Sequence, residues 1–125
     1  MRLVQVALRA QDLERATSFY GDLIGAQPRA VFDPPGLVFF DIGGTRLLLE
    51  KGAPPSLVYL EVGDLQRTVD DLRVQGVHIV AEPHLIFVHE DDRLGPAGSE
   101  EWMAFILDSE DNTVGLVSRI RTSGD

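Results

Sequence analysis

The sequence carries the same short pattern once in each half, and this repeat constrains the fold more than any single motif. The pattern of residues 7–16 is typical of the end of a strand followed by the start of a helix, and residues 59–68 show the same pattern. The shared Asp-Leu-x-Arg begins at Asp12 and again at Asp64, which are 52 positions apart. Because self-similarity at a fixed offset is the signature of repeated structural units, we expect two small modules with a site where they meet.

The first module is predicted to have the element order β-α-β-β-β. Apolar residues alternate over 3–10, which predicts a strand with one buried face. Asp12 is placed to cap a helix that ends at Gly25. Turn-forming residues then separate three further predicted strands, at 29–32, 37–42 and 46–50.

The second module repeats this order after a linker at 51–55. A strand at 57–62 leads to a helix capped by Asp64 and ended by Gly76. Further strands are predicted at 77–81, 102–107 and 113–118, with an interruption at Glu82-Pro83 and a polar, acidic loop at 89–100. We therefore predict a single domain, 1–125, made of module one (about 1–52), module two (about 56–118) and a tail (119–125).

Composition narrows the partners that this chain can have. A net charge of −9 argues against nucleic acid, which needs a basic face, and against an anionic membrane surface. No apolar run approaches the ~20 residues of a membrane helix, and the first residues lack a signal-peptide pattern. The absence of cysteine excludes disulfides, thiolate catalysis and zinc-thiolate sites. We expect a cytoplasmic protein whose partner is a small molecule.

Two segments resemble the vicinal oxygen chelate superfamily, which includes glyoxalase I, extradiol dioxygenases, methylmalonyl-CoA epimerase, and fosfomycin and bleomycin resistance proteins. The segment from Asp12 to Gly25 resembles the helix of the first module of that family, and residues 108–114 resemble its closing turn. The resemblance covers essentially the whole domain. It implies an α+β, glyoxalase-like fold in which two β-α-β-β-β modules pair into a cup-shaped mixed sheet. It also implies a homodimer, because the family usually covers its sheet edges by pairing or swapping modules.

The same resemblance assigns one metal ligand, usually His or Glu, to the first and last strand of each module. In this sequence those four positions hold Gln5, Leu48, Leu57 and Gly115. Glu50 lies two residues beyond Leu48 on the same strand face, as a displaced carboxylate. At most Gln5 and Glu50 can ligate, whereas a catalytic divalent metal normally has three protein ligands. We expect no cofactor, with a divalent metal on Gln5 and Glu50 as the alternative.

Strand alternation predicts which side chains face the cup. They form an apolar floor with a few polar groups, as in a typical ligand pocket. The residues expected to bind a ligand are Gln5, Arg9, Leu48, Glu50, Leu57, Tyr59, Glu61, His84 and Trp102. Structural roles compete with this interpretation: Arg9 and Glu61 are symmetry counterparts that could form an ion pair, and Trp102 could anchor the core.

Two histidine segments carry the remaining candidates. His84 follows Pro83 among apolar residues, so we expect a partly buried imidazole that is either a general base or a structural hydrogen-bonding group. Residues 89–92, His-Glu-Asp-Asp, lack the glycine spacing of a calcium loop and are predicted to form a solvated acidic loop. The same loop could act as a lid over a concave site.

These observations leave three hypotheses for function. The first is metal-independent binding or sequestration of a small, partly apolar organic molecule, as in bleomycin resistance proteins, with cationic ligands favoured by the acidic surface. The second is a metal-dependent lyase, isomerase or epimerase of the glyoxalase type, or a dioxygenase, with a rebuilt metal site. The third is an interaction module that has lost its pocket. We favour the first, and lean away from an enzyme, because ligands are missing from more than one strand.

Overall fold

The computed structural model describes residues 3–121, except for the side chain of Phe87. These residues form two compact units. Unit 1 contains residues 3–58 and 108–112, and unit 2 contains residues 59–107 and 113–121. No helix within 3–121 is long and apolar enough to cross a membrane.

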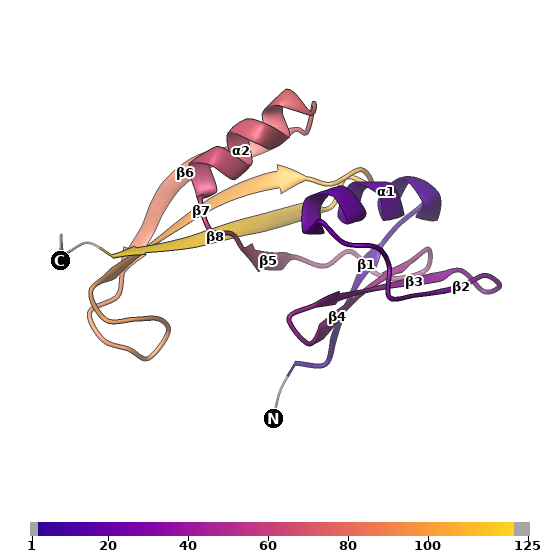
Figure 1. Cartoon of the computed structure of the whole chain (residues 1–125), viewed down its shortest axis with the longest axis horizontal. Coiled ribbons are helices and arrows are strands. Elements are labelled where there is room, and N and C mark those ends of the chain that lie inside the picture. Colours follow the sequence, from indigo (N-terminus) through magenta and orange to yellow (C-terminus); the bar gives the residue numbers. More distant parts are fainter. Residues whose placement is uncertain (1–2, 122–125) are drawn as a thin grey trace. The chain divides into compact units, whose positions relative to one another are not determined.

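Unit 1 is a four-stranded mixed sheet with one helix (Figure 1). Its elements are β1 (Gln5–Arg9), α1 (Leu13–Ile24), β2 (Ala30–Phe32), β3 (Leu37–Ile42) and β4 (Thr45–Glu50). The strand order is β1-β4-β3-β2. Strand β1 runs parallel to β4, and the other neighbours are antiparallel.

Unit 2 has the same arrangement (Figure 1). Its elements are β5 (Val58–Glu61), α2 (Leu65–Val74), β6 (Ile79–Val88), β7 (Ser99–Leu107) and β8 (Thr113–Arg121). The strand order, β5-β8-β7-β6, matches that of unit 1, and α2 begins 52 residues after α1. The α+β fold with two β-α-β-β-β modules is therefore confirmed, whereas the pairing of both sheets into one cup stays a prediction.

Both helices begin at the predicted aspartates. The Oδ1 atom of Asp12 accepts a hydrogen bond from the backbone N–H of Arg15 at 3.0 Å, and Asp64 accepts one from Arg67 at 3.1 Å. Gly25 ends α1 in the left-handed conformation, with φ of 75°, which glycine adopts at low cost. The buried side chains of α1 are Ala16 and Tyr20, and those of α2 are Leu65, Val69 and Leu72.

The turn between β7 and β8 belongs to unit 1, where it is held by α1. The buried Tyr20 hydroxyl donates to Asp108 Oδ2 at 2.6 Å. Asp108 Oδ1 accepts the backbone N–H groups of Glu110 and Asn112, both at 2.8 Å. The side-chain amide of Asn112 donates to the backbone oxygen of Arg9 at 2.7 Å. Burial, followed by the bond to Asp108, raises the pKa of Tyr20, so this hydroxyl stays a donor.

Three predicted boundaries in unit 2 were wrong. Strand β6 continues through Pro83 to Val88, because it is an edge strand with irregular pairing to β7, where a missing N–H is tolerated. Strand β7 already begins at Ser99, which shortens the acidic loop. Strand β8 extends to Arg121, three residues past the predicted end, and residues 122–125 of the predicted tail lie outside the described residues.

Candidate functional site

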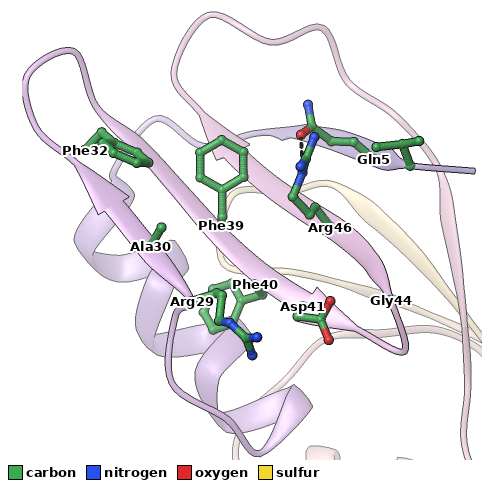
Figure 2. Close-up of a pocket in the computed structure, with 10 residues that line it drawn as sticks. Gln5, Arg29, Ala30, Phe32, Phe39, Phe40, Asp41, Gly44 and Arg46 are labelled. Atoms are coloured by element: carbon green, nitrogen blue, oxygen red, sulfur yellow. Dashed lines mark hydrogen bonds between the residues drawn. The ribbon is translucent and has the colours of Figure 1, made fainter.

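The first candidate site is a cavity in unit 1 (Figure 2). Leu8 and Leu49 are fully buried on the face of the sheet that packs against α1. Because side chains alternate along a strand, Gln5, Asp41 and Arg46 lie on the other face of this sheet. In the strand register, Arg46 of β4 pairs with Gln5 of β1 and with Asp41 of β3. The cavity has a volume of about 570 Å³. Its lining includes Gln5, Arg29, Phe32, Phe39, Asp41 and Arg46.

Arg46 organises the polar side of this cavity. Its Nε–H donates to Gln5 Oε1 at 2.9 Å, as the dashed line in Figure 2 marks. The carbon of its guanidinium lies 5.9 Å from the centre of the Phe39 ring, within cation–π range. Phe32 meets Phe39 edge to face, with ring centres 6.0 Å apart. Aromatic surface and directed N–H donors therefore occupy the same wall.

The two metal-ligand candidates, Gln5 and Glu50, do not come together. Gln5 is opposite Arg46 in the register, whereas Glu50 is opposite Arg9, four positions further along. Four positions correspond to roughly 13 Å along the strands. Leu48 lies between them and is buried. Among residues 3–121, no three His, Asp or Glu side chains are grouped so as to hold a metal ion.

In unit 2, the ligand position of the last strand is closed by an aromatic ring. A Cβ atom added to Gly115 would lie 2.6 Å from Cδ1 of Tyr59 and 3.2 Å from the ring of Phe105. These rings meet edge to face with centres 6.1 Å apart. Leu57, the other ligand position of this module, precedes β5 and is half exposed. Tyr59 thus occupies the space that a carboxylate side chain at position 115 would need.

A chain of charged side chains extends from Tyr59 across the same sheet. Arg119 lies 3.5 Å from Glu61 and 3.3 Å from Glu101, and Glu101 lies 2.9 Å from Nε2 of His89. Together with Tyr59 and Met103, three of these residues line a second cavity of about 350 Å³. Glu61, a candidate partner of Arg9, is thus paired within its own unit. The prediction that His89 is solvated was wrong: its side chain is buried and hydrogen-bonded to Glu101.

Two further candidates, His84 and Trp102, do not line these two cavities, although the His84 ring lies 6.5 Å from that of Phe105. His84 is exposed rather than partly buried, because it sits on the edge strand β6, where Leu85 and Ile86 are also exposed. Its Nδ1 lies 2.8 Å from the backbone oxygen of Glu82. Trp102 alternates along β7 with Glu101 and Met103, so its ring lies on the other face of the sheet from Tyr59.

Trp102 borders a separate cavity of about 430 Å³ with Leu65, Pro83 and Ile120, and its Nε1–H donates to Glu100. Of the predicted ligand-binding residues, only Gln5 lines the unit 1 cavity, and only Tyr59 and Glu61 line the cavity of about 350 Å³. Arg9 is exposed, and its backbone oxygen is used by Asn112.

Sequence reasoning missed Arg29 and Phe39 in unit 1 and Glu101 and Arg119 in unit 2, and it placed Arg46 on the cup face without including it among the ligand-binding residues. The alternation of β4 already placed Arg46 beside Leu48 and Glu50 on one face, which was the available signal. Glu101 and Arg119 are opposite each other only in the β7–β8 register, which the local pattern does not specify.

A duplicated β-α-β-β-β module with one helix on each sheet defines a glyoxalase-like protein. The sequence matches the Glyoxalase/Bleomycin resistance protein/Dioxygenase superfamily over residues 2–90, and the chain belongs to this superfamily. This match confirms the superfamily that residues 12–25 suggested, whereas residues 108–114 lie outside the matched range.

Individual relatives are more distant. The chain is 29% identical over 108 residues to the mitochondrial methylmalonyl-CoA epimerase of Mus musculus, covering 70% of this chain and 61% of that protein. The structure of lactoylglutathione lyase from Agrobacterium tumefaciens has a TM-score of 0.65 at 20% identity, with 94% of this chain and 92% of that chain covered. The structure of VPC_CASS1, from the mobile metagenome of V. Pseudocholerae, has a TM-score of 0.73 at 15% identity, with 94% of both chains covered. These two structural likenesses establish the fold alone.

Proposed function

We propose that this chain binds a small, partly apolar organic molecule in the unit 1 cavity without the help of a metal ion. The observation that carries the proposal is the hydrogen bond from Arg46 to Gln5. Among the four ligand positions of the family, Gln5 alone has a side-chain oxygen that could bind a metal ion. That oxygen accepts a hydrogen bond from the guanidinium of Arg46. Because a positive charge at this distance repels a divalent cation, Arg46 makes the position unsuited to a metal.

The form of the cavity supports the same conclusion. Its volume of about 570 Å³ falls within the roughly 300–1,000 Å³ of small-molecule sites. Such sites combine apolar lining with a few directed polar groups. Here Phe32 and Phe39 provide the apolar surface, and Gln5, Arg29 and Arg46 provide the polar groups.

Calorimetric titration of untagged, chelator-treated protein with Ni²⁺, Mn²⁺, Fe²⁺ and Zn²⁺ tests this proposal. We expect no saturable binding at micromolar protein concentration. Stoichiometric binding of one ion per chain that is lost in Gln5→Ala would overturn the proposal. Gln27→Ala is the matched control, because Gln27 is exposed and makes no side-chain hydrogen bond within residues 3–121.

The second candidate is a metal-dependent lyase, isomerase or epimerase. The similarity to methylmalonyl-CoA epimerase, which is an enzyme by name, favours it. This candidate needs ligands in addition to Gln5 and Glu50, such as residues contributed by a second copy of the chain in a homodimer. If the titration shows tight metal binding, sedimentation with and without the metal would show whether binding and dimer formation occur together.

A further inference from the structure

The unit 1 cavity carries charges opposite to those of the chain as a whole. The sequence has 20 acidic and 11 basic residues, yet the cavity is lined by Arg29 and Arg46 and by a single carboxylate, Asp41. Within residues 3–121, Arg29 has no acidic partner, and Arg46 is bound to a neutral amide. The local charge therefore favours an anion, whereas the net charge of the chain favours cations only at long range.

Arg46 keeps most of its hydrogen-bonding capacity for a ligand. A guanidinium has five N–H donors in a rigid fork, and within residues 3–121 only the Nε–H of Arg46 has an acceptor. The Nη groups remain available for a carboxylate, which is the geometry in which arginine binds most strongly. The bond to Gln5 and the contact with Phe39 restrain the side chain, which reduces the entropy lost when it binds.

The apolar part of the cavity is aromatic. Figure 2 shows the Phe39 ring between Arg46 and Phe32, and the rings of Phe32 and Phe39 meet edge to face. Phe32 is 52% exposed, so its ring presents open surface to a ligand. Aromatic pairs are stabilised beyond what area burial alone gives, so this surface favours a planar ring over an aliphatic chain.

We infer that the ligand of this cavity is an aromatic monocarboxylate, whose ring packs on Phe32 and Phe39 and whose carboxylate binds the Nη groups of Arg46. This inference rests on the proposed function and names the ligand class of the same site. Asp41 pairs with Arg46 in the strand register, but the Arg46 side chain donates its hydrogen bond to Gln5 instead. Within residues 3–121, the Asp41 carboxylate therefore has no ion-pair partner. Its negative charge disfavours dianions such as phosphate, which leaves a monoanion as the best fit.

The test is a set of NMR titrations of ¹⁵N-labelled full-length protein in the presence of a chelator. Phenylacetate is the main probe, with phenylacetamide as its neutral isostere, cyclohexylacetate as its non-aromatic counterpart and inorganic phosphate as the dianion. We expect phenylacetate to shift the side-chain signals of Gln5 and Arg46. We also expect it to bind about tenfold more tightly than phenylacetamide, which is a typical gain for a charge-assisted pair.

Variants assign the effect to named residues. Arg46→Gln is expected to weaken phenylacetate binding about tenfold and to change phenylacetamide binding by less than about twofold. Phe39→Leu is expected to weaken both probes. Arg67→Gln is the control, because Arg67 is exposed on α2 and its side chain has no partner within residues 3–121, and it should change neither. Arg29→Gln provides a second charge variant, and thermal unfolding confirms that each protein is folded.

The outcomes separate this inference from the proposed function. If phenylacetamide binds this cavity as tightly as phenylacetate, the ligand class is wrong and metal-independent binding of an organic molecule stands. Equal binding of phosphate would also refute the ligand class. Equal binding of cyclohexylacetate would likewise refute the aromatic part. If no probe shifts the unit 1 signals, the ligand class is refuted. If neutral and cationic aromatic fragments also leave these signals unchanged, the proposed function is refuted with it.

Discussion

The two modules share a backbone plan but differ at the positions where the family places its ligands. In module one, Gln5 is bound by Arg46 beside an aromatic cavity. In module two, the ring of Tyr59 lies over Gly115 and a row of ion pairs extends beyond it. The strand order and the helix caps are the same in both. Duplication has therefore preserved the fold, while the side chains have diverged: module one has a cavity lined by two arginines and one carboxylate, and module two has one arginine paired with two glutamates.

The turns before the last strands differ just as clearly. Asp41 precedes the turn between β3 and β4, is exposed, and makes no side-chain hydrogen bond within residues 3–121. Asp108 lies in the turn between β7 and β8, is 5% exposed, and accepts bonds from Tyr20, Glu110 and Asn112. The same residue type thus has a local solvated role in one module and a structural role in the other.

The largest predicted effect concerns the stability lost when Asp108 or Asp41 is replaced by alanine. Asp108→Ala is expected to lower the free energy of unfolding by about 3 kcal/mol or more, because several buried donors lose their acceptor at once. Asp41→Ala is expected to change it by less than about 0.5 kcal/mol. Urea unfolding followed by circular dichroism measures both, with Asp108→Asn as the conservative variant that keeps one acceptor. Equal losses at the two positions would show that the turns are energetically equivalent.

The sequence predicted the features that depend on local pattern and missed those that depend on strand register. The caps at Asp12 and Asp64 were predictable because each accepts from a backbone N–H three residues away. The burial of His89 was not, because its partner Glu101 lies across the β6–β7 connection and pairs with it only in the folded sheet. Local periodicity similarly placed Gln5 on the correct face but could not show that Arg46 occupies its oxygen.

An intermediate effect tests whether the ligand position of module two is closed. Gly115→Ala is expected to destabilise the protein by about 1–3 kcal/mol, because its Cβ would overlap the ring of Tyr59. Gly63→Ala is the control, since a Cβ there meets no atom within 4 Å. Thermal or urea unfolding measures both, and the Tyr59→Ala background should recover much of the Gly115→Ala loss in a double-mutant cycle. Strict additivity of the two substitutions would mean that Tyr59 does not fill this position.

The smallest predicted effect concerns Arg15 and its counterpart Arg67, 52 residues later. Arg15 lies 2.7 Å from Glu110, which also accepts the backbone N–H of Asp12, whereas the Arg67 side chain has no partner within residues 3–121. Burial acts to raise the pKa of Glu110, but the bonds from Arg15, Asp12 and Ser109 outweigh it and lower the pKa below its ordinary value of 4.5.

A lowered pKa in the folded state means that Glu110 stabilises the fold above its ordinary pKa and loses this contribution as the pH falls through the folded value. Arg15→Gln should therefore be less stable than wild type at pH 7, and the difference should shrink as the pH falls through the lowered pKa of Glu110 and this carboxylate becomes protonated. Arg67→Gln should differ little from wild type at either pH. Urea unfolding at pH 7, 5 and 3 measures this dependence. If the difference in unfolding free energy between Arg15→Gln and wild type stayed constant over this pH range, the charge of Arg15 would not be the cause. Packing of its side chain would then attach the turn at residues 108–112 to α1.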